Sequence, residues 1–332
     1  MKRGERPTLS VVCPCFNESE SIDAFYTALK SVLVQLDGLD HEILFVEDGG
    51  TDGTLERLNA IAAADPNVRP YALSRNFGHQ IALTAGMDAA AGDAVILMDS
   101  DLQHPPALIP EMVRRWRDGH DVVSCVRRRS KDAGALKQLG SSAFYWLVNR
   151  LSETPITPGA ADFCLLSRRA LDALRSMPEH SRFLRGMVSW IGFPRAFVEF
   201  DAPARYAGRS KYDLHSMVGL ALDAIFSFSS APLRLATRVG LTVVAAGVCY
   251  LVYIVVRLVL LGDLVPGWAS AVGVVLVLGG TQLVFIGLIG QYLARIFDES
   301  KSRPLYLLKQ TPDSIPQASP GAAVPRSRAA RR

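Results

Sequence analysis

Two long stretches without a charged residue constrain this chain most, at residues 239–256 and 264–294. Each is about as long as an α-helix must be to cross a hydrocarbon core of ~30 Å. Only a short segment with a break at Pro266 and Gly267 joins them. The pattern predicts a membrane hairpin with spans at 233–262 and 265–296, because the alternative, two buried core helices, does not suit stretches so long and so close together.

Basic residues flank this hairpin on its outer ends. Arg234 and Arg238 precede the first span, and several lysines and arginines follow the second. The connecting turn carries Asp263, with Arg257 just before it. By the positive-inside rule, both ends lie in the cytoplasm. The apolar run at 9–16 is too short for a signal peptide, so we expect a multi-pass inner-membrane protein with its large N-terminal part in the cytoplasm.

That N-terminal part alternates between strand and helix patterns. Strands are predicted at 9–15, 42–46, 68–73, 94–98 and 121–126, and helices at 18–36, 54–64, 80–91 and 106–117. Such alternation predicts βαβ units and an α/β fold with a mostly parallel sheet. Further on, the pattern predicts strands at 163–166 and 196–201 and helices at 136–151, 169–175 and 180–190.

Three further segments complete the predicted organisation. Residues 1–212 form the α/β domain, and apolar residues recur at helical spacing through 213–232. So close to a membrane span, such a helix fits the bilayer interface, although an ordinary core helix stays an alternative. Residues 297–332 form a basic and largely disordered tail. The net charge of +4 is modest and concentrated near the membrane flanks and the tail, so nucleic acid is not an expected partner.

The most telling polar segment is Asp99-Ser100-Asp101-Leu102-Gln103, directly after the predicted strand at 94–98. In open α/β sheets, ligands bind beyond the carboxyl ends of the strands. Hard divalent cations take oxygen ligands and often share their shell with substrate phosphates. The segment therefore suggests a site for a metal-bound diphosphate. The alternative is a pair of acidic caps on the following helix.

Polar clusters also follow the three preceding strands, at 12–18, 45–54 and 74–80. In the second cluster, Asp48 is placed to accept a hydrogen bond from a base or ribose, and Asp52 to cap the next helix. In the third, Arg75 suits an anionic group, whereas His79 is either a helix-start residue or a base. Four strand ends with such clusters favour a ligand site over isolated helix caps.

With these motifs, the chain resembles family 2 glycosyltransferases of the GT-A fold. Within them it is similar to the polyprenyl-phosphate hexosyltransferases, the group of dolichyl-phosphate mannose synthase and bactoprenol glucosyltransferase. The matching motifs are SRNFG at 74–78, AGMDAAAGD at 85–93, MDSDLQHP at 98–105, ADFCLLSRR at 161–169, RFLRG at 182–186, RYAGRSKY at 205–212 and RIFDESKSRP at 295–304. The resemblance implies a Rossmann-like GT-A domain, then an interfacial amphipathic helix and a two-helix transmembrane hairpin.

The resemblance also implies roles for particular residues. Those implied to bind the nucleotide are Pro14, Phe16, Glu18, Val46, Asp48, Asn76 and Ser100. Those implied to hold Mg²⁺ or Mn²⁺ and the donor diphosphate are Asp99, Asp101 and Gln103. Those implied to hold the acceptor phosphate or the pyrophosphate are Arg127, Arg205, Arg209, Ser210 and Lys211. Asp99, Asp101, Asp162, Arg205 and Lys211 form the implied catalytic set, in which Asp162 is either a base or a structural carboxylate paired with Arg168 or Arg182.

The implied reaction moves a hexose from a nucleotide diphosphate to a polyprenyl phosphate at the cytoplasmic membrane face, for modification of cell-envelope glycans. UDP-glucose and undecaprenyl phosphate are the first choice. GDP-mannose, UDP-galactose, UDP-N-acetylhexosamine or an aminoarabinose donor are alternatives, because Cys164 and Gln291 depart from the usual family residues. A processive polysaccharide synthase and an inactive membrane scaffold are further alternatives, and a homo-oligomer is left open.

Overall fold

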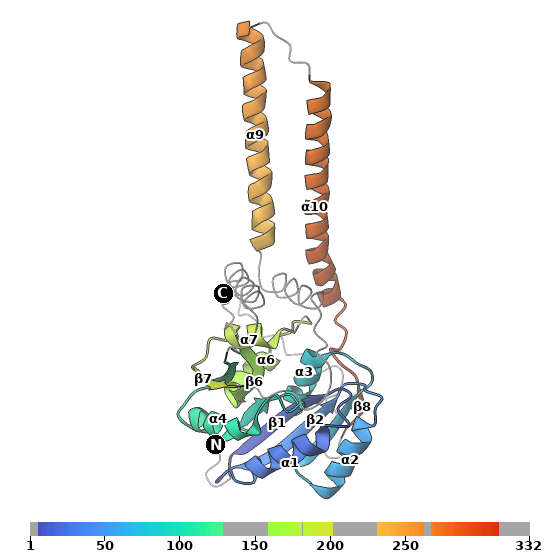
Figure 1. Cartoon of the computed structure of the whole chain (residues 1–332), viewed down its shortest axis with the longest axis vertical. Coiled ribbons are helices and arrows are strands. Elements are labelled where there is room, and N and C mark those ends of the chain that lie inside the picture. Colours follow the sequence, from blue (N-terminus) through green and yellow to red (C-terminus); the bar gives the residue numbers. More distant parts are fainter. Residues whose placement is uncertain (1–5, 129–158, 181, 202–230, 262–266, 312–332) are drawn as a thin grey trace, which may run out of the picture.

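The computed structural model describes residues 6–128, 159–180, 182–201, 231–261 and 267–311. Figure 1 shows two parts, an α/β domain and a pair of long helices that project from it. The predicted helix at 136–151, the amphipathic segment 213–232 and the tail beyond residue 311 lie outside the described residues.

One mixed sheet is the centre of the α/β domain. Its eight strands follow the order β7-β5-β6-β4-β1-β2-β3-β8. Their bounds are β1 Thr8–Cys15, β2 Asp40–Glu47, β3 Val68–Leu73, β4 Ala94–Leu97, β5 Val122–Arg127, β6 Ala160–Ser167, β7 Arg195–Phe200 and β8 Leu308–Gln310. Strands β1 to β4 pair in parallel, as do β5 and β7, whereas β6 and β8 run antiparallel to their neighbours. The prediction of a mostly parallel sheet is confirmed.

Helices cover both faces of this sheet. Their bounds are α1 Ile22–Leu33, α2 Thr54–Ala64, α3 His79–Ala89, the 3₁₀ turn η1 Pro106–Leu108, α4 Ile109–Arg117, α6 Arg168–Arg175 and α7 Leu184–Trp190. Helices α1, α2 and α4 pack with one buried apolar cluster, which includes Phe25 and Ile96. Helices α3, α6 and α7 pack with the other, which includes Val12 and Leu97. Because alternate residues of a strand face opposite sides, the nearly continuous apolar strands supply both cores.

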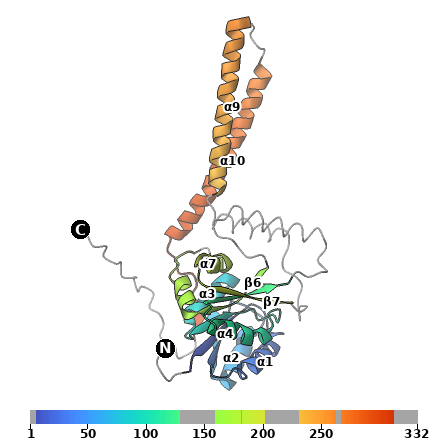
Figure 2. The ribbon, with the colours of Figure 1, turned by 90° about the vertical axis from the view of Figure 1, so that its left-hand side faces the viewer.

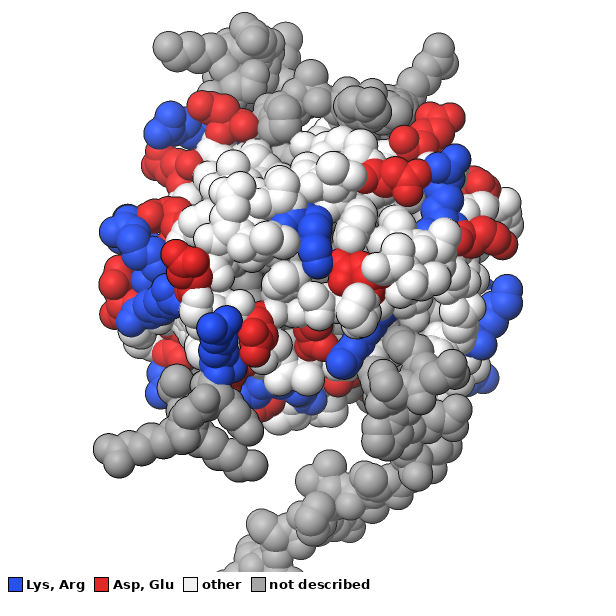
Figure 3. All heavy atoms as spheres, turned by 90° about the horizontal axis from the view of Figure 1, so that it is seen from below, with Lys and Arg blue, Asp and Glu red and all other residues white. Residues whose placement is uncertain are grey.

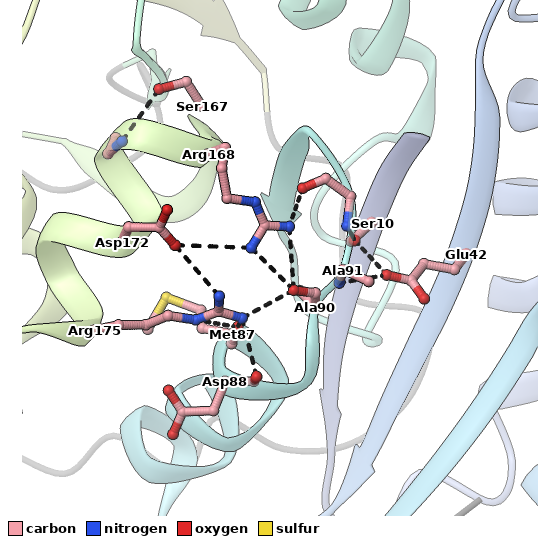
Figure 4. Close-up of polar contacts among 12 residues, drawn as sticks. Ser10, Glu42, Met87, Asp88, Ala90, Ala91, Ser167, Arg168, Asp172 and Arg175 are labelled. Atoms are coloured by element: carbon pink, nitrogen blue, oxygen red, sulfur yellow. Dashed lines mark hydrogen bonds and ion pairs between the residues drawn. The ribbon is translucent and has the colours of Figure 1, made fainter. Parts of the chain in front are cut away.

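Helix α3 is held in place by two arginines of α6 (Figure 4). Arg175 donates to the carbonyls of Met87, Asp88 and Ala90, which include the last unpaired acceptors of α3. Arg168 donates to the carbonyls of Ala90 and Gly92 just beyond the helix. Cations at a helix C-terminus also favour its dipole. The C-terminal end of α3 is therefore fixed, and its N-terminal end reaches the carboxyl edge of the sheet.

The two long helices are α9 Ala231–Leu261 and α10 Trp268–Ser300. At 1.5 Å per residue they measure about 46 and 50 Å, longer than a hydrocarbon core of ~30 Å. Each contains a candidate membrane span, at Leu233–Tyr250 and Val277–Ser300, and neither span is buried inside the protein. Side chains such as Leu241 and Leu283 are each 70% exposed. The exposure is that of a membrane hairpin and rules out the alternative of two buried core helices.

The chain returns to the α/β domain after α10 (Figure 2). Strand β8 adds to the outer side of β3, where Ala72 pairs with Gln310. The sequence predicted a basic and largely disordered tail at 297–332, and β8 is an ordered segment within it, whereas residues 312–332 lie outside the described residues. Three residues, Leu-Lys-Gln, carry no alternating pattern that identifies a strand, and the pairing depends on the edge that β3 presents.

Seen from below, acidic and basic side chains are interspersed over the part of the domain drawn in colour (Figure 3).

Candidate active site

The carboxyl ends of β1 and β4 are joined by a buried hydrogen bond. Ser100 Oγ donates to the carbonyl of Pro14 at 2.9 Å. Next to it, Leu102 adopts φ 62°, a left-handed conformation that is costly for a residue with a branched side chain. Asp101 Oδ1 accepts from the Gln103 amide at 3.0 Å, which stabilises this turn. The strained turn places Asp99, Asp101 and Gln103 together beyond β4.

Asp99 has one carboxylate oxygen without a hydrogen-bond partner. This oxygen, Oδ1, is buried although the side chain is 32% exposed. The Asp99 amide donates to Nδ1 of His104 at 2.9 Å, so Nδ1 is an acceptor and the ring proton lies on Nε2. Burial lowers the pKa of His104, which agrees with a neutral ring. The Nδ1–Asp99 Oδ2 distance of 3.6 Å is therefore not an ion pair.

His79 lies between two carboxylates that come from different strands. Its Nε2 is 3.3 Å from Asp99 Oδ1 and 3.7 Å from Asp162 Oδ2. His79 is the first residue of α3, and the arginines of α6 hold the other end of this helix in place. His79 is thus a helix-start residue, one of its two interpretations from the sequence. Its ring also faces the carboxylates of the site, and the other interpretation, a base, stays a prediction.

Asp162 is a buried, fully hydrogen-bonded carboxylate at the start of β6. Arg185 donates to its Oδ1 through Nε at 2.8 Å and to its Oδ2 through Nη2 at 2.9 Å, and Gln80 Nε2 adds a contact to Oδ2 at 3.2 Å. Burial alone would raise its pKa, but the Arg185 charge and hydrogen bond, with His79 and His104, outweigh burial and lower it. The expected partners Arg168 and Arg182 are wrong: both donate to backbone carbonyls instead.

The loop after β2 packs against the loop after β3 through Asp48. Its two carboxylate oxygens accept from the amides of Phe77 and Gly78, at 2.7 and 2.9 Å. Glu47 likewise accepts from the amides that follow it, and burial raises the pKa of both carboxyls. Gly49 has φ 69°, and a Cβ on it would lie 2.3 Å from the backbone carbon of Arg75. Only glycine permits this approach of the two loops.

The other residues predicted to bind the nucleotide differ in how far their side chains are exposed. Phe16 is 36% exposed at the end of β1, and Asn76 is exposed in the loop after β3. Glu18 accepts from Ser21 Oγ at 2.7 Å in the turn before α1. The Val46 side chain is fully buried in the core beside α3, so only its backbone can face a ligand. Asp52 caps α2 as predicted, because its Oδ1 accepts from the Thr54 amide at 3.1 Å.

The residues predicted to hold an acceptor phosphate lie only in part within the described structure. Arg127 is the exposed last residue of β5. Strand β5 runs parallel to β4 and is separated from it by β6 alone, so Arg127 lies on the same edge as Asp99, about 10 Å away across the sheet. Arg205, Arg209, Ser210 and Lys211 lie outside the described residues.

The side chains beyond β4 suit a divalent cation shared with a ligand. The described residues contain no group of three or more His, Cys, Asp or Glu side chains placed to hold a metal ion. Asp99 and Asp101 nevertheless present carboxylate oxygens, one of them buried and without a hydrogen bond, beside the amide of Gln103. Oxygen ligands of this kind suit Mg²⁺ or Mn²⁺ when a diphosphate completes the coordination shell.

Three residues of this site were not assigned a role from the sequence. Gln80, His104 and Arg185 hold Asp162 or Asp99, and His79 lies between the two. His104 and Arg185 stand in the quoted motifs MDSDLQHP and RFLRG, which was the available signal. Their partners Asp99 and Asp162 are 5 to 82 residues away in the chain, so spacing alone did not reveal them.

Family models match two parts of the chain. The model "Glycosyl transferase family 2" matches residues 10–175, and "GtrB C-terminal hairpin" matches residues 231–296. The first covers the described site except Arg185, and the second covers most of α9 and α10.

Individual relatives cover most of the chain. An uncharacterized glycosyltransferase of Synechocystis sp. is 40% identical over 90% of this chain and 94% of its own length. The bactoprenol glucosyl transferase of Shigella phage SfV is 39% identical over 91% of this chain and 98% of its own. Among solved structures, glucosyl-3-phosphoglycerate synthase of Mycobacterium tuberculosis with Mn²⁺, UDP-glucose and phosphoglyceric acid is 23% identical, with a TM-score of 0.46 over 67% of this chain and 79% of its own.

Proposed function

Because the chain belongs to glycosyl transferase family 2, we propose that it transfers glucose from UDP-glucose to the phosphate of a polyprenol, with undecaprenyl phosphate as the first choice. It is a glycosyltransferase with a GT-A domain and a C-terminal helical hairpin. The relatives named bactoprenol glucosyl transferase support glucose and a lipid acceptor. The exposed apolar hairpin supports an acceptor that resides in a membrane.

The observation that carries the proposal is the buried Oδ1 of Asp99 beside Asp101, which accepts no hydrogen bond and lies 3.3 Å from Nε2 of His79. With Gln103, these residues would hold Mg²⁺ or Mn²⁺ together with the donor diphosphate. Such an ion neutralises the charge that develops on the leaving diphosphate. The loops after β1, β2 and β3 line the same edge and would bind the nucleotide, with Phe16 exposed for contact with the base.

The acceptor needs no strong base. A phosphate monoester has a second pKa near ~6, so it is largely dianionic at neutral pH. One of its oxygens attacks the anomeric carbon, the bond from that carbon to the diphosphate breaks, and UDP leaves. Asp162 stays ionised beside Arg185, which suits a residue that orients its neighbours more than one that collects a proton. Arg127, together with Arg205, Arg209, Ser210 and Lys211, would hold the acceptor phosphate or the pyrophosphate.

We place the α/β domain on the cytoplasmic side of the inner membrane. Arg234 and Arg238 precede the uncharged stretch 239–256, and Arg295, Lys301 and Arg303 follow the uncharged stretch 264–294. Basic residues favour the cytoplasmic side. Both helices exceed the thickness of the hydrocarbon core, so their ends near the domain extend to the membrane surface. The phosphate of an embedded polyprenol lies at that same surface.

A processive polysaccharide synthase receives no support from the described residues. Such enzymes resemble one another in a Gln-x-x-Arg-Trp motif, but Arg115 and Trp116 follow Met112 where that motif has Gln. The pair lies near the end of α4, which leads into the N-terminal end of β5. Arg115 pairs with Glu111 of its own helix at 2.9 Å. This places the pair away from the carboxyl edge that carries Asp99.

The test is sugar transfer by purified protein in liposomes that contain undecaprenyl phosphate. Radiolabelled UDP-glucose is compared with GDP-mannose, UDP-galactose, UDP-N-acetylhexosamine and an aminoarabinose donor, and the label in butanol-extractable lipid is counted. UDP-glucose is expected to be the best donor, and the variants Asp99→Ala and Asp101→Ala are expected to be inactive. A better donor than UDP-glucose would overturn the choice of sugar, and full activity of both variants would overturn the site.

A further inference from the structure

The end of the hairpin is fastened to the α/β domain by one histidine, His180. Its backbone amide donates to Glu299 Oε1 at 2.8 Å, and its ring Nδ1 lies 2.8 Å from Glu299 Oε2. On the other side of the ring, Nε2 lies 2.7 Å from the carbonyl oxygen of Arg303. Carboxylates and carbonyls only accept hydrogen bonds, so both contacts together require the doubly protonated imidazolium. These three contacts join residues that are 119 to 123 positions apart in the chain.

A second set of contacts fastens the residues that follow. We call residues 299–310 the strap. Tyr306 OH donates to Asp88 Oδ2 at the end of α3, at 3.0 Å. The carbonyl of Leu307 accepts from the Ser74 amide at 2.8 Å, and β8 then pairs with β3. Ser74 begins the loop whose amides at Phe77 and Gly78 bind Asp48. The strap therefore contacts the loop after β3, which lines the nucleotide side of the site.

His180, which contacts Glu299 at the start of the strap, is also close in sequence to the residues that hold Asp162. Helix α7 begins four residues after His180, and the Leu184 amide donates to Gln80 Oε1 at 3.0 Å. The next residue, Arg185, holds Asp162. Five residues of chain span at most about 18 Å even when fully extended. His180 is thus close along the chain to the group that fixes Asp162, and it is bonded to the end of the helix that reaches the membrane.

We propose that His180 is a positioning residue, which fastens α10 to the segment that supplies Arg185 and so holds the site at the height of a membrane-embedded acceptor phosphate. This inference rests on the proposed function for its choice of acceptor. A loose linker after α10 would let the domain move relative to the bilayer, and a lipid phosphate cannot follow it. A soluble acceptor diffuses to the site at any height. The fastening therefore affects only the acceptor that is fixed in the membrane.

The first test compares two acceptors in the full-length protein in liposomes. The variants are His180→Ala and Glu299→Gln, and the acceptors are undecaprenyl phosphate in the bilayer and a water-soluble ten-carbon prenyl phosphate. His180→Ala is expected to raise KM for the bilayer acceptor about fivefold, a modest effect because the contacts are partly exposed. KM for UDP-glucose and kcat with the soluble acceptor should change by no more than about twofold relative to the unmodified protein. A general structural defect would change these two parameters as well. Glu299→Gln keeps an acceptor for the His180 amide and should show a smaller effect.

The matched control is Lys301→Ala. Lys301 lies in the strap but pairs with Asp298 of α10 at 2.7 Å, so its removal takes away a charge without a contact to the α/β domain. It should leave both acceptors unaffected. Equal losses with both acceptors in His180→Ala, or an unchanged KM for the bilayer acceptor, would contradict the proposal.

A second measurement does not depend on sugar transfer. Hydrogen exchange of the full-length protein in liposomes should become faster at residues 184–190 and 308–310 in His180→Ala and stay unchanged in Lys301→Ala. Unchanged exchange in His180→Ala would overturn the fastening role. If no donor is transferred by the unmodified protein, the proposed function fails, and the exchange measurement still decides whether His180 fastens the strap.

Discussion

Arg185 contacts both carboxylate oxygens of Asp162, with Nε 2.8 Å from Oδ1 and Nη2 2.9 Å from Oδ2. Gln80 occupies a further position on Oδ2, so three N–H groups surround a carboxylate that is only 9% exposed. Hydrogen bonds to the charged form and a nearby cation both favour ionisation. The pair thus converts a buried acid into a fixed negative charge that faces His79 and, beyond it, Asp99.

Replacement of Asp162 by Asn tests whether this carboxylate is a base. Loss of a general base typically costs about 10²-fold or more in rate. Because the pKa of Asp162 is lowered, the residue does not titrate near neutral pH, and we expect Asp162→Asn to lower kcat by less than that and to leave the shape of the pH–rate profile between pH 6 and 8 unchanged. Loss of one limb of the profile would instead identify Asp162 as the base.

Replacement of Arg185 by Ala should have a different effect. It leaves a buried carboxylate with one neutral donor, which we expect to cost on the order of 2 kcal/mol of stability and to lower the thermal unfolding midpoint in detergent. The double variant Asp162→Asn/Arg185→Ala removes the unpaired charge as well. It should be more stable than Arg185→Ala alone, and a double variant that is less stable would contradict this account.

Gly49 should tolerate no side chain, because two independent costs coincide there. The variant Gly49→Ala combines φ 69° with a Cβ only 2.3 Å from the Arg75 backbone, so the loops after β2 and β3 must separate. We expect KM for the nucleotide donor to rise about tenfold. Gly119→Ala is the matched control, since Gly119 has φ 96° but nothing within 4 Å of the added Cβ. A similar KM in both variants would show that φ strain alone matters.

The sequence predicted most of the regular elements because their signals are local. Helix α2 at Thr54–Ala64 and strand β3 at Val68–Leu73 have the predicted bounds, since Asp52 and the apolar runs define them within a few residues. Helix α7 begins at Leu184 and not at 180, because His180 is bonded to Glu299 and lies outside the helix. That partner is 119 residues away, and no local pattern encodes it.

The candidate site likewise contains residues that the local sequence could predict and residues that it could not. Asp99, Asp101 and Gln103 were predictable, since the strand before them and the residue types stand side by side in the chain. The partner of Asp162 was not, because Arg168, Arg182 and Arg185 are all within reach in sequence and only the packing of α6 and α7 distinguishes them. The Val46 side chain is buried in the core, so the nucleotide-binding role that the resemblance implied for Val46 stays a prediction for its backbone.

Arg175 is expected to stabilise the domain more than a surface arginine does. It donates to three carbonyls at the end of α3, so Arg175→Ala removes these hydrogen bonds and should cost about 1–3 kcal/mol in unfolding free energy. Arg114, which is 62% exposed and pairs with Glu111 in its own helix, is the control, and Arg114→Ala should change stability much less than Arg175→Ala does. Equal effects on thermal unfolding would contradict the role assigned to Arg175.

The strap should loosen as the pH rises. The carbonyl of Arg303 and the carboxylate of Glu299 raise the pKa of His180, with Asp298 also nearby, while burial and Arg182 act against them. A raised pKa in the folded state means that the stabilisation is complete below about pH 6.5 and is lost as the pH rises through the folded pKa. Hydrogen exchange at residues 308–310 should therefore accelerate between pH 6.5 and 8.5 beyond its intrinsic pH dependence. In His180→Gln this excess should vanish, and an excess that persists would assign the effect to another group.

Metal dependence is the most direct test of the residues beyond β4. If Asp99 and Asp101 hold the ion, chelation should abolish transfer, and Mn²⁺ or Mg²⁺ should restore it. Asp99→Asn removes one unit of charge from the shell and should lower kcat about 10²-fold or more, since stabilisation of the leaving diphosphate by an ion is worth several kcal/mol. Titration calorimetry gives a readout without turnover: Mn²⁺ should strengthen UDP binding to the unmodified protein and to the control Asp118→Asn, at the end of α4, but not to Asp99→Asn. UDP binding that Mn²⁺ strengthens equally in all three proteins would show that the ion is held elsewhere.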